Sequence, residues 1–153
     1  MDHETFTALI RQYTPNMYRL SCGMLRCSAD AEDAVSEAVL RAWENLDRLK
    51  KPESFKAWIM QITANEARKI YRHTRRVSCV ESVEDVTPVF ADDHHELWDA
   101  VMKLDEGYRA VIILYFYERL SIREIAKALH IAEGTVKSRL SRGKKLLKEV
   151  LSQ

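Results

Sequence analysis

The residues best suited to bind a polyanion lie near the end of the chain. Residues 137 to 148 include six lysines and arginines and no acid. Long cationic side chains can neutralise phosphates or reach guanine edges, and serines among them permit close approach and donate hydrogen bonds. This chemistry is typical of nucleic-acid binding. No carboxylate cluster or phosphate-binding glycine loop points to an enzyme of nucleic-acid chemistry.

A helical periodicity of about 100° per residue sorts this segment into two faces. Apolar residues gather on one face, namely Val136, Leu140, Leu147 and Leu151. Cations and hydroxyls gather on nearly the opposite face, namely Lys137, Ser138, Ser141, Arg142 and Lys145. The sorted polar face predicts a recognition helix, whereas an isolated basic run would more simply be a solvated surface.

The preceding residues supply the second helix that such a recognition helix needs. Ser121 and Glu124 have the spacing of a capping box and predict a helix over residues 121–129. Its apolar positions are Ile122, Ile125, Ala126 and Leu129. After a short turn, Thr135 is expected to cap a second helix within residues 133–151. Two helices joined in this way form a helix-turn-helix, whose second helix can enter the major groove.

A second stripe with nucleic-acid chemistry is predicted on a helix over residues 54–76, with Ser54 as its N-cap. The stripe combines amides and arginines, namely Gln61, Asn65, Arg68, Arg72 and Arg75. An asparagine can read a base edge while arginines hold phosphates. Phe55, Trp58 and Tyr71 could stack on an unpaired base, although the periodicity favours Phe55 and Trp58 as core residues.

An acidic helix that includes residues 30–38 is predicted in addition to these two cationic surfaces. Four of its acids are Asp30, Glu32, Asp33 and Glu37. Phosphates would repel this helix, so it requires a protein partner or solvent. Acids in a first turn also stabilise a helix through its dipole, which is the alternative explanation for the first three.

The overall pattern predicts an all-α protein with two small helical domains, residues 1–76 and 94–153, joined by a flexible acidic linker over residues 77–93. Four glycines and three prolines are few for a β-rich protein. Further helices are expected over residues 6–25 with an interruption near Pro15, and over residues 31–49, 94–103 and 106–118. The linker combines Pro88 with many acids.

The composition also bears on location and cofactors. No run approaches the roughly 20 apolar residues of a membrane span, and the first residues lack the pattern of a signal peptide, so a cytoplasmic protein without membrane insertion is expected. Cys22, Cys27 and Cys79 form an odd set without a CxxC pair and are interpreted as buried or incidental thiols. His94 and His95 adjoin acids, but adjacent linker residues rarely point at one ion, so neither a metal nor another cofactor is expected.

Four segments together resemble the signature sequences of extracytoplasmic-function (ECF) sigma factors of bacterial RNA polymerase, in the sigma-70 family. They are Asp30-Ala31-Glu32-Asp33, Arg41-Ala42-Trp43, Phe55-Lys56-Ala57-Trp58 and Gly134-Thr135-Val136-Lys137-Ser138-Arg139-Leu140-Ser141-Arg142. They occur in the family's order and cover both predicted domains. Two positions depart from the common pattern: Ser36 stands where many members have glutamine, and Lys69 where many have aspartate.

The resemblance implies a non-catalytic initiation factor that directs core polymerase to specific promoters. It assigns polymerase binding at the β′ clamp helices to Asp30, Glu32, Asp33 and Glu37. It assigns the −10 element to Gln61, Asn65, Arg68, Arg72 and Arg75, with the loop at residues 49–55. It assigns the −35 element to Thr135, Lys137, Ser138, Arg139, Ser141, Arg142 and Lys145.

The same resemblance implies further partners. Other surfaces of the C-terminal domain would touch the β flap. An anti-sigma factor, either soluble or membrane-anchored, would hold the protein until it associates with the nucleoid. The free protein is expected to be a monomer. The residues alone leave open a stand-alone helix-turn-helix regulator, which would need a dimer surface and a palindromic operator, and a pure interaction module, which would leave the basic face unexplained.

Overall fold

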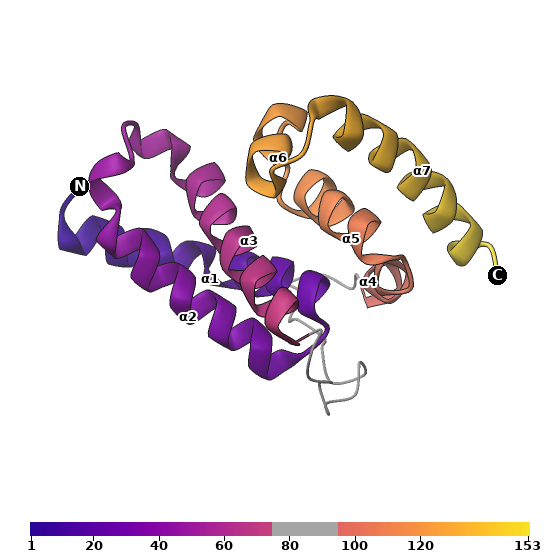
Figure 1. The fold of residues 1–153 in the computed structure, drawn as a ribbon, viewed down its shortest axis with the longest axis horizontal. Helices are drawn as coiled ribbons and strands as arrows, with labels where there is room; N and C mark the ends of the chain where they lie inside the picture. The colour runs from indigo at the N-terminus through magenta and orange to yellow at the C-terminus, as the bar shows by residue number, and fades with distance from the viewer. Residues whose placement is uncertain (75–94) are drawn as a thin grey trace. The chain divides into compact units, whose positions relative to one another are not determined.

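The computed structural model describes residues 1–74 and 95–153, and divides the chain into two units, Met1–Pro88 and Val89–Gln153. The described residues contain helices and no strand, which confirms the all-α prediction (Figure 1). The division falls within the predicted linker, which lies outside the described residues together with Arg75, Cys79 and His94. The predicted domain boundaries therefore stay predictions.

The N-terminal unit is a bundle of three helices, α1 (His3–Leu25), α2 (Ser28–Glu44) and α3 (Phe55–Thr74), each of which packs against the other two. Two short 3-10 turns, η1 (Leu46–Arg48) and η2 (Pro52–Ser54), connect α2 to α3. Its largest fully buried side chains are Met17, Leu20, Phe55, Ile59 and Met60. Burial of each such side chain contributes about 1.5 to 3 kcal/mol and holds α3 in place.

The buried face of α2 consists of alanines. Ala31, Ala34, Ala38 and Ala42 are all fully buried, at helical spacing along one side. Small side chains let neighbouring helix backbones approach closely, because the distance between helix axes depends on the residues at the contact. The alanine face therefore fixes which side of α2 points to solvent.

Pro15 does not interrupt the first helix, contrary to the prediction. α1 runs through it, although proline lacks the N–H group that would extend the backbone ladder. Pro15 itself is exposed, and the neighbouring Thr14 hydroxyl donates to the Ile10 carbonyl at 2.6 Å. Buried Phe6 lies before the proline and buried Met17 after it, so tertiary packing on both sides overrides the local preference.

The predicted ends of α2 and α3 were also imprecise. α2 stops at Glu44 and not at residue 49, because the backbone leaves the helical conformation at Asn45. The Asn45 side chain donates to the Arg41 carbonyl at 2.8 Å and so satisfies a carbonyl at the helix end. Ser54 is not the N-cap of α3, since it belongs to η2, where its N–H donates to the Lys51 carbonyl at 3.0 Å. α3 nevertheless begins one residue later, at Phe55.

The C-terminal unit contains α4 (His95–Met102), α5 (Glu106–Ile112), the π-helical turn η4 (Ile113–Tyr117), α6 (Ile122–Leu129) and α7 (Glu133–Leu151). Its core includes Trp98, Ile112, Ile113, Leu114 and Ile125. Gly143 of α7 is buried against α5, where an added Cβ would lie 3.3 Å from the Ile112 side chain. This glycine therefore permits the close packing that supports α7.

The helix-turn-helix is formed by α6 and α7. The predicted capping box is confirmed: the Glu124 N–H donates to Ser121 Oγ at 3.1 Å, and the Ser121 N–H donates to Glu124 Oε1 at 2.9 Å. His130 ends α6 in the left-handed conformation, with φ of 56°. The prediction that Thr135 caps α7 is wrong, because the Ala132 carbonyl already accepts from the Val136 N–H at 3.1 Å and starts the helix at Glu133.

Two further properties concern thiols and membranes. Cys22 and Cys27 are buried, as interpreted from the sequence, and burial raises the pKa of the Cys22 thiol to about 12. Cys22 therefore stays protonated at neutral pH. Within residues 1–74 and 95–153, no helix is both long and apolar enough to cross a bilayer.

Candidate nucleic-acid interfaces

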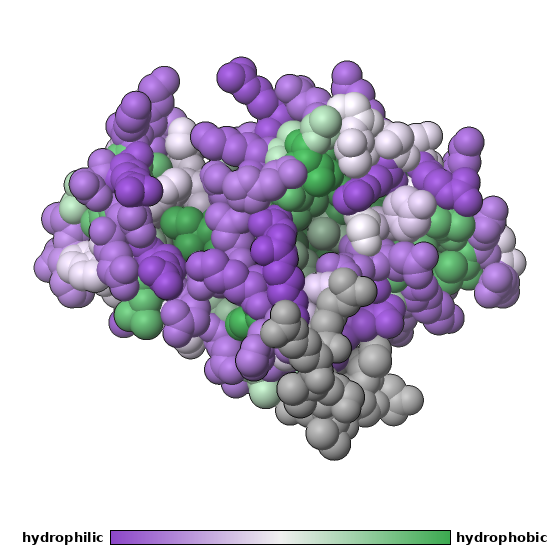
Figure 2. Space-filling view, in the orientation of Figure 1, coloured by the Kyte–Doolittle hydropathy of each residue, from purple (hydrophilic) through white to green (hydrophobic). Residues whose placement is uncertain are grey.

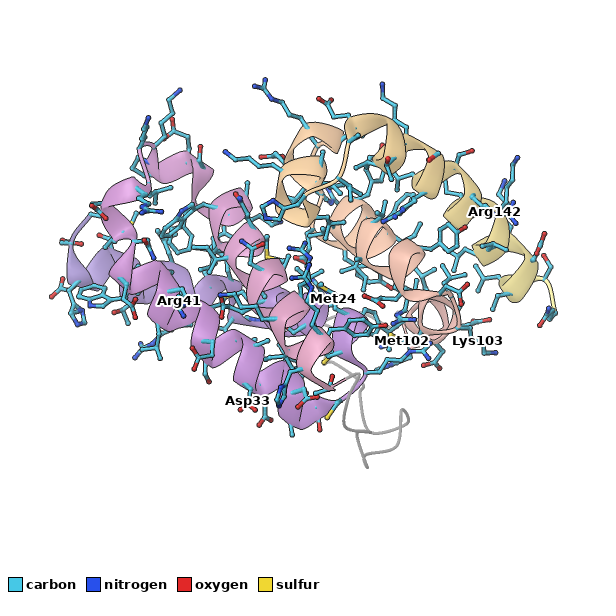
Figure 3. The ribbon with its side chains drawn as sticks, viewed as in Figure 1. Met24, Asp33, Arg41, Met102, Lys103 and Arg142 are labelled. Carbon is cyan, nitrogen blue, oxygen red and sulfur yellow. The ribbon has the colours of Figure 1, made fainter. Side chains whose placement is uncertain are left out.

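The predicted polar face of α7 is present in the structure. Its members are all exposed, namely Lys137, Ser138, Ser141, Arg142 and Lys145. On the opposite side Val136, Leu140 and Gly143 are buried. Arg142 projects from α7 in Figure 3. A helix anchored along one side in this way presents cations and hydroxyls together, which is the chemistry that phosphates and base edges require.

Two other residues of the predicted set lie at the border of this face. Thr135 and Arg139 are half-buried. The Arg139 guanidinium lies 3.7 Å from the position that a Cβ on Gly107 would take, so it reaches toward the start of α5. Ser138 Oγ donates to the Thr135 carbonyl at 3.1 Å, which leaves its oxygen lone pairs to accept. The structure thus separates five outward side chains from two at the border.

The predicted stripe on α3 is less uniform. Arg72 is exposed, whereas Gln61, Asn65 and Arg68 are half-buried, and Arg75 lies outside the described residues. Arg68 Nη1 donates to Asn65 Oδ1 at 3.0 Å. Burial lowers the pKa of the Arg68 guanidinium, and the nearby Arg72 charge lowers it further. Arg68 and Arg72 therefore differ in their surroundings although the sequence groups them together.

A buried carboxylate joins α2 to α3. Glu66 is 7% exposed, and its Oε2 lies 3.0 Å from Lys69 Nζ and 4.0 Å from Arg41 Nε. Both cations are at least half exposed, so each pair contributes little stability on its own. This cluster was not among the predicted sites, although the i, i+3 spacing of Glu66 and Lys69 is a signal for the local pair. Lys69, one of the two positions that depart from the pattern of the resembled family, is thereby held by Glu66.

Of the three aromatic residues of α3, Phe55 is a core residue, whereas Trp58 and Tyr71 are half-buried. Phe55 is 1% exposed, and its ring lies 6.2 Å from that of Phe6, 5.9 Å from that of Tyr13 and 5.7 Å from that of Trp58. The interpretation of Phe55 as a core residue is confirmed. Trp58 is half-buried at the edge of this cluster. Phe55 is therefore not available to stack on a base.

The acidic residues of α2 lie opposite its alanine face. Glu32, Asp33 and Glu37 are exposed and Asp30 is half-buried (Asp33 is labelled in Figure 3). Two large apolar side chains share this exposed side, Leu40 at 55% and Trp43 at 49% exposure. The sequence analysis missed them as surface residues, although the alanine periodicity could have placed them there. An exposed apolar centre with acids around it is typical of a protein-binding surface.

The C-terminal unit has an apolar groove of about 460 Å³ away from the polar face of α7. Its walls include Leu97 of α4, Phe116 of η4, and Leu147 and Leu151 of α7, with Lys144 and Lys148 beside them. Phe116 and Leu151 are exposed at 46% and 44%, and Figure 2 shows hydrophobic residues at the surface near α5 and the C-terminal half of α7. Lys144 Nζ lies 5.4 Å from the Phe116 ring centroid. This surface suits an apolar partner and not DNA.

Together these features define a class. A helical protein with a recognition helix, an amide-and-arginine stripe and separate apolar or acidic faces is a DNA-binding protein that also docks on other proteins. The family model described as Sigma-70 region 2 matches residues 9–77, and the one described as Sigma-70, region 4 matches residues 94–147.

Known proteins resemble the chain along nearly its whole length. RNA polymerase sigma factor CarQ of Myxococcus xanthus is 31% identical, over 98% of this chain and 91% of CarQ. ECF RNA polymerase sigma factor SigL of Mycobacterium tuberculosis is 31% identical, over 95% of this chain and 88% of SigL. A structure of sigma factor RpoE with the anti-sigma factor NepR, from Bartonella quintana, matches with a TM-score of 0.80 and 26% identity over 96% of both chains.

The chain therefore belongs to the ECF sigma factors of the sigma-70 family. Its function is that of a sigma factor, which directs transcription initiation at promoters. The match to region 2 in the N-terminal half excludes the interpretation as a stand-alone helix-turn-helix regulator, because such a regulator does not contain a sigma region 2.

Proposed function

We propose that α7 reads the −35 element as duplex DNA and α3 captures the −10 element. The observation that carries this proposal is the exposed face of α7, where five cations and hydroxyls lie together within residues 137–148, a segment without an acid. Lys137, Ser138, Ser141, Arg142 and Lys145 would make direct contacts, with Thr135 and Arg139 at the border. On α3 the contacts come from Gln61, Asn65, Arg68, Arg72 and Arg75. Residues 1–76 and 94–153 act as two modules joined by the linker of residues 77–93.

Run-off transcription with purified core polymerase tests this proposal. The protein should confer a defined start site, Arg142→Ala should reduce use of the −35 element about tenfold and Asn65→Ala should impair promoter opening to a similar extent, since one base or phosphate contact contributes about 1 to 3 kcal/mol. Lys103→Ala is a matched control, because Lys103 is an exposed cation after α4 (Figure 3). An equal loss with Lys103→Ala would show that general charge, and not the α7 face, determines the effect.

The acidic face of α2 is the proposed docking surface for the clamp helices of the polymerase β′ subunit. Asp30, Glu32, Asp33 and Glu37 provide the charge, and the exposed Leu40 provides an apolar anchor among them. Buried apolar anchors ringed by polar residues contribute most of the binding energy in many protein interfaces. Since an acidic helix repels DNA, this assignment leaves the two DNA contacts to α3 and α7.

The apolar groove of the C-terminal unit is the proposed site for the polymerase β flap. Its rim lysines would favour an apolar segment flanked by acids. Phe116→Ser should weaken competition with wild-type protein for limiting core polymerase by about tenfold or more. Because Phe116 is half exposed, the melting temperature and direct binding to a promoter duplex should stay unchanged. Undiminished competition by this variant would exclude the groove as the flap site.

The proposal also includes regulation and location. An anti-sigma factor, soluble or membrane-anchored, would hold the free monomer, since the matched RpoE was solved in complex with the anti-sigma factor NepR. The released protein would act on polymerase at the nucleoid in the cytoplasm. It would contribute binding and not catalysis, and need no cofactor, because the proposed contacts require only the side chains on α2, α3 and α7.

A further inference from the structure

Two hydrogen-bonded pairs follow each other along α3. Arg68 donates to Asn65 at 3.0 Å, and Lys69 donates to Glu66 at 3.0 Å, each pair with i, i+3 spacing. Arg68 is half-buried beside Asn65, whereas Arg72, one turn later on the same stripe, is exposed. The arginines of the stripe are therefore not equivalent contacts for phosphate.

The Arg68 bond holds the oxygen of the Asn65 amide. A guanidinium has only donors, so it must face the amide oxygen and not the amide nitrogen. The donor is also charged, which makes the hydrogen bond stronger than a neutral one. With Oδ1 held by Arg68, the amide keeps its N–H donors away from the guanidinium. The Asn65 side chain is thus oriented before any nucleic acid arrives.

We propose that Arg68 is a positioning residue, which orients the Asn65 amide so that its N–H donors meet an acceptor atom on the −10 base. The inference rests on the proposed function and deepens it, since it names the kind of base edge that α3 reads. Arg68 then sets base choice through Asn65, while Arg72 holds a phosphate. This differs from the expectation that all arginines of the stripe hold phosphates.

The two roles predict different defects. Loss of a positioning group should broaden the choice of base at one position, because the Arg68 donor then no longer favours the amide nitrogen over the amide oxygen at the base. Loss of a phosphate contact should weaken binding to all sequences about equally and reduce the slope of log affinity against log salt by about 1. The base profile therefore distinguishes them, whereas total activity does not.

The experiment uses holoenzyme reconstituted from this protein and core polymerase. The template library carries a promoter mapped with the wild-type protein and randomised across its −10 element, and the transcripts are sequenced. Asn65→Ala identifies the position that Asn65 reads. Arg68→Met keeps the apolar stem but removes the donors, and it should flatten the base preference at that same position about tenfold. Arg68→Lys keeps one donor and should restore part of the preference.

Further variants make the test decisive. The double variant Asn65→Ala with Arg68→Met should be no flatter than Asn65→Ala alone, since Arg68 acts through Asn65. Arg72→Ala should lower the yield of every library member and leave the profile intact. If Arg68→Met behaves like Arg72→Ala, or flattens a different position, the positioning role is wrong. If wild-type holoenzyme selects no library member, the proposed function itself fails and the inference falls with it.

Discussion

The free protein should bind a promoter duplex about a hundredfold more weakly than the protein bound to core polymerase. A single DNA-binding module buries only about 600 to 1,000 Å². A weak contact with a Kd of about 10 µM gains about a hundredfold when its effective concentration reaches about 1 mM. Polymerase would produce that concentration by holding α3 and α7 on one promoter at the same time.

Fluorescence anisotropy of a labelled promoter duplex, at about 0.15 M salt, measures this difference with and without core polymerase. The free protein should also lose affinity steeply as salt rises, because its binding depends on lysine and arginine contacts to phosphate. Nanomolar binding by the free protein, with no gain from core polymerase, would contradict the account. A promoter with a scrambled −35 element is the matched DNA control.

Charge reversal on α2 should have the second large effect. Asp33→Arg combined with Glu37→Arg should weaken binding to core polymerase by more than about a hundredfold, because like charges opposed across an interface disfavour binding by several kcal/mol. Both side chains are exposed and lie opposite the buried alanines, so the fold should persist. Competition with labelled wild-type protein for core polymerase measures the loss.

The matched control reverses an acid outside this face. Asp47 is exposed in η1, and Asp47→Arg should change polymerase binding by less than about threefold, as expected for a peripheral charge. Leu40→Ser should weaken binding about tenfold without a charge change. Asp47→Arg changes the net charge half as much as the double reversal does. If it also has about half of the double reversal's effect on the binding free energy, the binding depends on net charge and not on the α2 face.

Much of the architecture could be predicted because periodicity reports which side of a helix is buried. The capping box at Ser121 and Glu124 specifies the start of α6 through local hydrogen bonds, and the alternation of apolar and cationic residues places the polar face of α7 correctly. Features of this kind depend on residues that are close in the sequence, so the sequence pattern predicts them. The charged stripe on α3 was found for the same reason.

The misses arise where packing overrides a local preference. Pro15 stays within α1 because buried residues on both sides hold it, and Thr135 lies inside the first turn of α7 because the Ala132 backbone begins the helix. Arg139 shows the same limit without overturning its assignment: it lies at the border of the α7 face and its guanidinium reaches toward Gly107, and its contact with DNA stays a prediction. Side-chain partners such as Arg68 and Asn65 depend on rotamers, which residue spacing does not specify.

The alanine face of α2 separates the two roles of that helix. Four alanine positions support the bundle, and the polymerase contacts proposed for α2 lie outside this face. Evolution or protein engineering could therefore substitute the exposed residues of α2 without a change in the packing of the buried alanines. Such a helix is a suitable starting point for the design of a sigma factor that binds an altered core polymerase and does not bind the polymerase of the host.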